Sequence, residues 1–142
     1  MNLIETSLQI ALRAYGGKTD KAGREYILHP LRVMAKMSTD LERSAALLAL
    51  RDVLEDSDIT AEQLLAEGIP AEVVEAVQCL TKREGEDYLE FVARTRLNSL
   101  ARRVKIADIE DNIDVLRLSS LHESDYERIR RYHAAWRLLQ ER

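Results

Sequence analysis

Apolar residues recur at the spacing of an α-helix in one segment after another, and no segment keeps the two-residue alternation of a strand. The first segment places apolar side chains at Ile4, Leu8, Ala11, Leu12 and Tyr15. Steps of three and four residues bring such side chains onto one face of a helix. Only 5 glycines and 2 prolines interrupt the 142 residues. The sequence therefore predicts an all-α protein of about seven to nine helices.

Turn and cap residues divide the chain into separate helices. Gly16-Gly17 is expected to end the first helix, and Pro30 fits the first turn of the second because no amide donor is needed there. Two segments, Thr60 to Gln63 and Ser124 to Glu127, have the capping-box pattern that opens a helix. The predicted helices cover residues 4–15, 30–37, 41–54, 60–67, 71–80, 88–96, 97–111 and 124–139.

Length and composition predict one compact helical domain, residues 1–142. Hydrophobic residues make up 46% of the chain and charged residues 32%, which argues against a disordered or fibrous protein. With 21 basic and 25 acidic residues the formal charge is −4, so charge gives no reason to expect a nucleic-acid partner. Arginines cluster at 102–103 and 128–131 with acidic residues interleaved, which predicts ion-paired helix faces in solvent.

The sequence has no basic leader followed by an unbroken apolar core, and no apolar stretch approaches the ~18 residues that span a membrane. We therefore expect a soluble cytoplasmic protein without a membrane partner. The single cysteine, Cys79, excludes an internal disulfide and is expected to be a small core residue. Trp136 fits packing against the chain's own core better than a dimer interface, and a homodimer is left open.

The segment from Leu47 to Thr60, LLALRDVLEDSDIT, carries an apolar run into an acidic cluster. Asp52, Glu55 and Asp56 stand at positions i, i+3 and i+4, so a helix places three carboxylates on one face. Buried carboxylates are costly unless a positive charge faces them. Either a metal ion or Arg51 fills that role, and the function depends on which one does.

One imidazole and two carboxylates are candidate metal ligands. His29, Asp52 and Asp108 come from three separate predicted helices, and this set of nitrogen and oxygen donors suits Mn²⁺, Fe²⁺ or Mg²⁺ better than structural zinc. Glu55 and Asp56 would then orient a water molecule. The alternative is a hydrogen-bonded core histidine with surface acids, which is the commoner use of such residues. The loop before the histidine contains cations that either bind phosphate or are ordinary loop residues: Lys18, Lys21 and Arg24.

Four stretches, in this order, resemble the HD-domain phosphohydrolases: DKAGREYILHPLRV (20–33), LLALRDVLEDSDIT (47–60), AVQCLTKREGEDY (76–88) and VKIADIEDNID (104–114). Within that family the chain is most similar to the hydrolase domain of the RelA/SpoT-type alarmone enzymes and to the small alarmone hydrolases. The resemblance implies an all-helical fold with a divalent metal, usually Mn²⁺. The family holds this metal with a His, a His-Asp doublet and a later Asp.

The resemblance also implies a role for each matching position. His29 matches the first ligand, Asp52 the Asp of the doublet and Asp108 the last ligand. Glu55 and Asp56 match an acidic pair that helps to activate the attacking water. The implied reaction removes the 3′-pyrophosphate from a guanosine tetra- or pentaphosphate (ppGpp or pppGpp), or cleaves a related nucleotide.

The chain departs from the family at the doublet, which reads Arg51-Asp52 instead of His-Asp. A guanidinium has no lone pair for a metal and keeps its positive charge. At about 4 Å and an effective dielectric constant near 20, each unit of like charge costs ~4 kcal/mol, and a divalent ion doubles that cost. Two hypotheses follow: a metal-dependent phosphohydrolase with a weakened site, or an inactive ligand- or partner-binding protein in which Arg51 replaces the metal. A third possibility is that Arg51 was introduced by mutation into a working enzyme.

The substrate site also departs from the pattern of the family. Asn112 matches an Asn that helps to hold the nucleotide. In contrast, this chain has Tyr15 where the family usually has a loop His, and Asp20-Lys21 where it usually has an Arg-Lys pair. It also has Asp114 where the family has a basic residue after the Asn. Two losses of positive charge weaken the expectation of an alarmone substrate more than the expectation of a phosphate ester in general.

Overall fold

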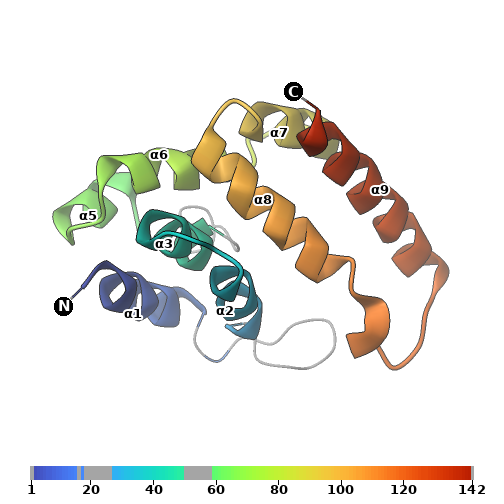
Figure 1. The fold of residues 1–142 in the computed structure, drawn as a ribbon, viewed down its shortest axis with the longest axis horizontal. Helices are drawn as coiled ribbons and strands as arrows, with labels where there is room; N and C mark the ends of the chain where they lie inside the picture. The colour runs from blue at the N-terminus through green and yellow to red at the C-terminus, as the bar shows by residue number, and fades with distance from the viewer. Residues whose placement is uncertain (1, 16, 18–26, 50–58, 142) are drawn as a thin grey trace.

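A computed structural model describes residues 2–15, 17, 27–49 and 59–141. The described part is all-α and contains no strand, which confirms the predicted fold class. Figure 1 shows α8 running through the middle of the molecule, with α1 to α6 on one side and α9 on the other. The elements are α1 (Leu3–Tyr15), α2 (Leu28–Ala35), α3 (Asp40–Ala49), α5 (Ala61–Ala66), α6 (Ala71–Cys79), α7 (Tyr88–Thr95), α8 (Ser99–Asn112), the 3₁₀ turn η1 (Val115–Arg117) and α9 (Glu123–Gln140).

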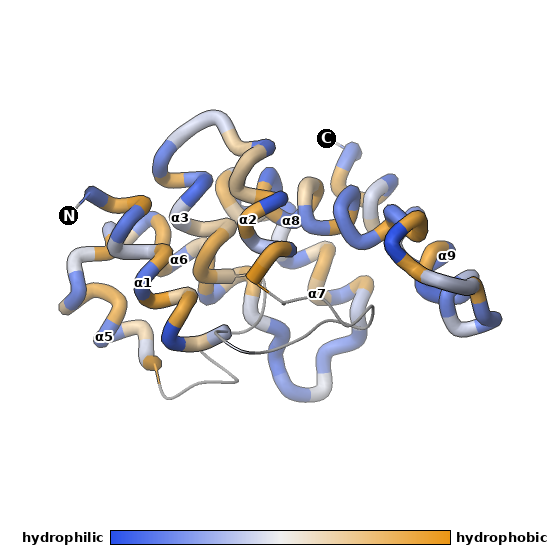
Figure 2. The backbone as a smooth tube through the Cα atoms, turned by 90° about the horizontal axis from the view of Figure 1, so that it is seen from below, coloured by the Kyte–Doolittle hydropathy of each residue, from blue (hydrophilic) through white to orange (hydrophobic). Residues whose placement is uncertain are grey.

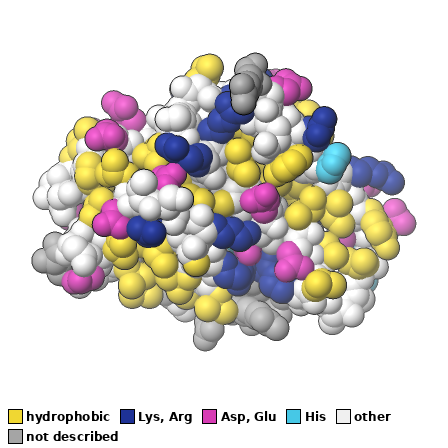
Figure 3. Space-filling model, viewed as in Figure 1, with side chains coloured by type: hydrophobic (Ala, Val, Ile, Leu, Met, Phe, Trp, Pro, Cys, Tyr) yellow, Lys and Arg dark blue, Asp and Glu magenta, His cyan; other side chains and the backbone are white. Residues whose placement is uncertain are grey.

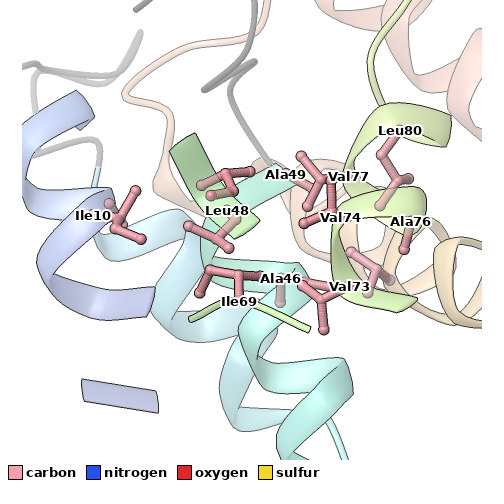
Figure 4. Close-up of a cluster of buried hydrophobic side chains, with 14 of the residues drawn as sticks. Ile10, Ala46, Leu48, Ala49, Ile69, Val73, Val74, Ala76, Val77 and Leu80 are labelled. Atoms are coloured by element: carbon pink, nitrogen blue, oxygen red, sulfur yellow. The ribbon is translucent and has the colours of Figure 1, made fainter. Parts of the chain in front are cut away.

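The main hydrophobic core forms around α3, which packs against α1, α2, α6 and α8. The helix is apolar over almost all of its second half, so it can be buried on every side. Ala46, Leu47 and Leu48 are fully inaccessible to solvent. Figure 4 shows side chains of α1, α3 and α6 meeting in this core, with Ile10 on one side and Val73 and Val77 on the other.

A second, smaller core joins the C-terminal helices. It consists of Val92 from α7, Ile109 from α8, and Ala135 and Leu139 from α9. Trp136 packs against this cluster, in agreement with its expected place in the chain's own core. Figure 2 shows α9 as largely hydrophilic, with apolar residues concentrated in the N-terminal helices. Helix α8 contributes residues to both cores and so connects them.

The local signals in the sequence mostly place the helix ends correctly. Thr60 and Gln63 form both hydrogen bonds of the predicted capping box, and the helix that they open is followed by Gly68 at a φ of +96°. One prediction is wrong: α9 begins at Glu123, not at the predicted capping box of Ser124. The physical reason is that the Asp125 carboxylate accepts the backbone N–H of His122 at 2.8 Å, which fixes the cap two residues earlier.

Charged side chains on the surface are interleaved as the sequence predicted. Figure 3 shows basic and acidic groups mixed across one face and not gathered into separate patches. From the two arginine clusters, Arg103 pairs with Glu42 at 2.8 Å and Arg128 pairs with Asp125 at 2.7 Å. In the ranges that the structure describes, no helix is long and apolar enough to cross a membrane.

The main core gives a direct test of the packing. Leu48→Ala removes a fully buried side chain, so we expect it to lower the free energy of unfolding by about 2–5 kcal/mol. Leu65→Ala is the matched control because Leu65 is 49% exposed on α5, and its effect should stay within about 0.5 kcal/mol. Urea titrations of both variants measure the difference. Equal losses for the two leucines would contradict this core.

Candidate functional site

His29 lies in the first turn of α2, buried between two carboxylates of α8. Its Nε2 atom is 2.8 Å from Oδ1 of Asp108, and its Nδ1 atom is 2.5 Å from Oδ2 of Asp111. The two aspartates are three residues apart on α8, which places them one above the other on a single helix face. The imidazole is 6% exposed, so this contact is made away from bulk solvent.

Asp111 is held by groups from two other parts of the chain. The guanidinium of Arg32, one turn after His29 on α2, donates two hydrogen bonds to this carboxylate, at 2.8 and 3.0 Å. Arg117, in the 3₁₀ turn after α8, donates to the backbone carbonyl of the same aspartate at 2.8 Å. A buried carboxylate needs such partners to stay ionised. The pair of arginines therefore fixes Asp111 behind the imidazole.

Asp108 is surrounded by donors from its own helix as well as by His29. Lys105 Nζ lies 2.9 Å from Oδ2 of Asp108, and Asn112 Nδ2 donates to Oδ1 at 2.9 Å. The positions 105, 108 and 112 follow the three- and four-residue steps of one helix face. Both carboxylate oxygens of Asp108 thus accept hydrogen bonds from protein groups.

The two carboxylates decide the charge of the imidazole. Burial by itself would lower the pKa of His29, but the hydrogen bonds and negative charges of Asp108 and Asp111 outweigh it and raise the pKa to about 8. Burial would likewise raise the pKa of Asp108, yet the charge of Lys105 and the contact with His29 lower it to about 2. For Asp111, hydrogen bonds from His29 and Arg32 outweigh burial and hold the pKa well below its usual range.

His29 and Asp108 are at hydrogen-bond distance, and the same distance also occurs between two adjacent ligands of one cation. Two donors that each lie ~2.1 Å from an ion, at a right angle, are separated by about 3.0 Å. The observed separation of Nε2 and Oδ1 is 2.8 Å. A carboxylate that accepts from the other ring nitrogen, as Asp111 does, commonly orients a metal-binding histidine. In the described ranges, no group of three or more His, Cys, Asp or Glu side chains could hold a metal ion.

The structure brings together three of the residues singled out from the sequence. His29 and Asp108 are in contact, and Asn112 is hydrogen-bonded to Asp108. The others lie outside the described residues, so their roles stay predictions. These are Arg51, Asp52, Glu55 and Asp56 of the acidic segment, and Lys18, Lys21 and Arg24 of the loop.

Sequence reasoning missed Arg32, Lys105 and Asp111. A signal for the last two was present, because residues 105, 108, 111 and 112 repeat at helical spacing through an otherwise apolar helix face. Charged residues on a buried face must be paired, so the pattern pointed to partners from elsewhere in the chain. No such signal marks Arg32, which becomes recognisable only when α2 and α8 are packed together.

Comparison with known proteins relates the chain to one class of enzyme. The chain is 30% identical over 124 residues to a guanosine-3′,5′-bis(diphosphate) 3′-pyrophosphohydrolase of Aquifex aeolicus (strain VF5). The alignment covers 80% of this chain, and the chain spans only 18% of the length of that relative. No family model matches the sequence. The similarity supports a relationship to that family of hydrolases.

The charge of His29 can be measured in the presence of a chelator. We expect the His29 ring signal in NMR to titrate near pH 8, and His29→Gln identifies it among the three histidines. Because its pKa is raised on folding, the stabilisation is complete below pH 6.5 and is lost as the pH rises through 8.

The full change in the free energy of unfolding, from well below pH 6.5 to well above pH 8, is roughly 2 kcal/mol. Urea titrations should show this decrease for the natural sequence, and His29→Gln should lack it. A ring signal that titrates at or below pH 6.5 would contradict the arrangement of His29 between two ionised carboxylates.

Proposed function

We propose that this chain is a metal-dependent phosphohydrolase of the HD type that acts on a nucleotide phosphate ester. The observation that carries the proposal is the 30% identity, over 80% of the chain, to a hydrolase of guanosine-3′,5′-bis(diphosphate). The contact of His29 with Asp108 supports it, since these are two of the three matched ligand positions and they lie 79 residues apart in the sequence. A guanosine bearing pyrophosphate groups is the first substrate to test.

In this proposal His29, Asp52 and Asp108 hold a divalent ion, with Mn²⁺ as the expected metal. The bound ion would stabilise the negative charge that develops on a phosphoryl oxygen. Asp111 fixes the His29 ring through its Nδ1–H, so that Nε2 faces Asp108. Glu55 and Asp56 would position the attacking water.

Several groups would bind the substrate. Asn112 lies beside Asp108, where its side-chain amide can hold the nucleotide. Lys18, Lys21 and Arg24 would receive its phosphate groups, because ammonium and guanidinium groups donate to phosphate oxygens.

A second candidate function is ligand or partner binding without turnover. The specific observation in its favour is that both oxygens of Asp108 already accept from protein donors, with Lys105 on one oxygen and His29 and Asn112 on the other. A positive side chain then neutralises the carboxylate in place of a metal. Arg51 would complete this arrangement at the position where the family has a ligand.

Restoring the missing histidine ligand at position 51 distinguishes the hydrolase from the binding protein without turnover. We expect Arg51→His to bind Mn²⁺ stoichiometrically and to release phosphate or pyrophosphate from at least one member of a panel of guanine nucleotides. The natural sequence should bind the metal much more weakly, because it lacks one ligand and carries an added positive charge. Metal analysis after gel filtration and a phosphate-release assay provide the two measurements.

Asp108→Asn in the Arg51→His background is the matched control, since it removes one ligand charge and should abolish both metal binding and turnover. If the natural sequence binds Mn²⁺ and turns over as fast as Arg51→His, binding without turnover is wrong. If Arg51→His gains neither metal nor activity, the hydrolase proposal is wrong.

A further inference from the structure

Beside Asp108, three helices place aromatic rings and cations in contact; we refer to Tyr88, Phe91, Lys105, Arg131 and Tyr132 as the Tyr88 cluster. Lys105 Nζ lies 4.9 Å from the centre of the Phe91 ring and 5.6 Å from that of Tyr88. The Arg131 guanidinium lies 5.5 Å from the Tyr88 ring and 5.9 Å from the Tyr132 ring. The two tyrosine rings meet edge to face at 6.0 Å.

The hydroxyl of Tyr88 is buried and has no hydrogen-bond partner among the described residues. A buried hydroxyl without a partner has lost its hydrogen bonds to water, and no protein hydrogen bond offsets that desolvation cost. Such a group in a folded protein is usually paired with an acceptor. Burial raises the pKa of Tyr88 to about 12, which keeps the phenol protonated at neutral pH. The acceptor that it calls for is therefore an atom with a lone pair, such as a phosphate oxygen.

Arg131 is a second group of the cluster that can donate to an anion. Its side chain is exposed, and no ion pair joins it to a carboxylate in the described part of the chain. By contrast, Arg128 on the same helix is paired with Asp125 at 2.7 Å. Among the described groups, Lys105 and Arg131 bring positive charge close to Tyr88, and Asp108 brings negative charge. The surroundings of the free hydroxyl thus favour an anion.

Lys105 connects this cluster to the candidate functional site. The same ammonium group lies over the Tyr88 ring and is 2.9 Å from Oδ2 of Asp108. A ligand at Tyr88 and a phosphoryl group at Asp108 would therefore be separated by one side chain.

We propose that the Tyr88 cluster is a subsite for a second phosphate or pyrophosphate group of the substrate, with the Tyr88 hydroxyl and the Arg131 guanidinium donating to its oxygens. The assignment rests on the proposed function, because it presumes a substrate with more than one phosphate group bound beside Asp108. An ordered water can also satisfy the hydroxyl of Tyr88, so the binding experiments below compare the two. A phosphate group can accept from both the Tyr88 hydroxyl and the Arg131 guanidinium.

Binding of inorganic pyrophosphate, with a chelator present, tests the subsite without any turnover. Tyr88→Phe removes only the hydroxyl and keeps the ring on which Lys105 and Arg131 lie. Arg131→Gln removes the charge. We expect each to weaken the binding of pyrophosphate about tenfold in isothermal titration calorimetry, the factor for one hydrogen bond to a charged group. Arg130→Gln is the matched control, because Arg130 is exposed on the same helix outside the cluster, and it should bind like the natural sequence.

A second measurement uses the natural sequence alone, so it stands even where a variant fails to fold. With tyrosine labelled at ¹³Cζ, pyrophosphate should shift the signal of Tyr88 and leave that of Tyr126, which is 45% exposed on α9, unchanged. Equal binding by Tyr88→Phe, Arg131→Gln and Arg130→Gln, or an unshifted Tyr88 signal, would overturn the subsite. Loss of pyrophosphate binding in both cluster variants, together with an Arg51→His protein that stays inactive, would retain an anion site and reject the hydrolase.

Discussion

The imidazole of His29 joins the two halves of the molecule by contacting Asp108 and Asp111, which lie 79 and 82 residues further along the chain. Burying two carboxylates is costly unless positive groups face them. His29, Arg32 and Lys105 supply those charges, two from α2 and one from α8. The ionic contact therefore fixes how α2 packs on α8, and with it the place where a ligand can meet both helices.

Helix α8 carries the site because it is shared by two cores. Its Ala101, Val104 and Ala107 belong to the main core, and Ile109 belongs to the smaller one with α7 and α9. The face between these contacts carries the buried charges. Among the described residues, four positive groups contact Asp108 and Asp111 when the imidazole is protonated: His29, Arg32, Lys105 and Arg117. The described groups of the site are thus net positive in a chain with a formal charge of −4, which suits an anionic ligand.

The sequence predicted the helices well because each has a strong local signal. The period of Ile4 to Tyr15 and the capping box at Thr60 depend only on neighbouring residues, and both are confirmed. The start of α9 was predicted wrongly because Ser124 has the chemistry of an N-cap. In the structure His122 is the N-cap, and its backbone N–H donates to the carboxylate of Asp125. Within the site, His29 and Asp108 were candidates from residue chemistry and from the family resemblance, and Asn112 from the resemblance alone, whereas Arg32 and Asp111 were not identified.

By itself the sequence determined the all-α class, most helix boundaries and the candidate ligands, since these depend on periodicity, caps and residue chemistry within a few turns. Only the tertiary structure decided which charges meet. The pairing of His29 with Asp111 and of Lys105 with the ring of Tyr88 joins groups from different helices. The physical reason is that a buried charge takes its partner from whatever element packs against it, and that packing is set by the apolar faces of the helices.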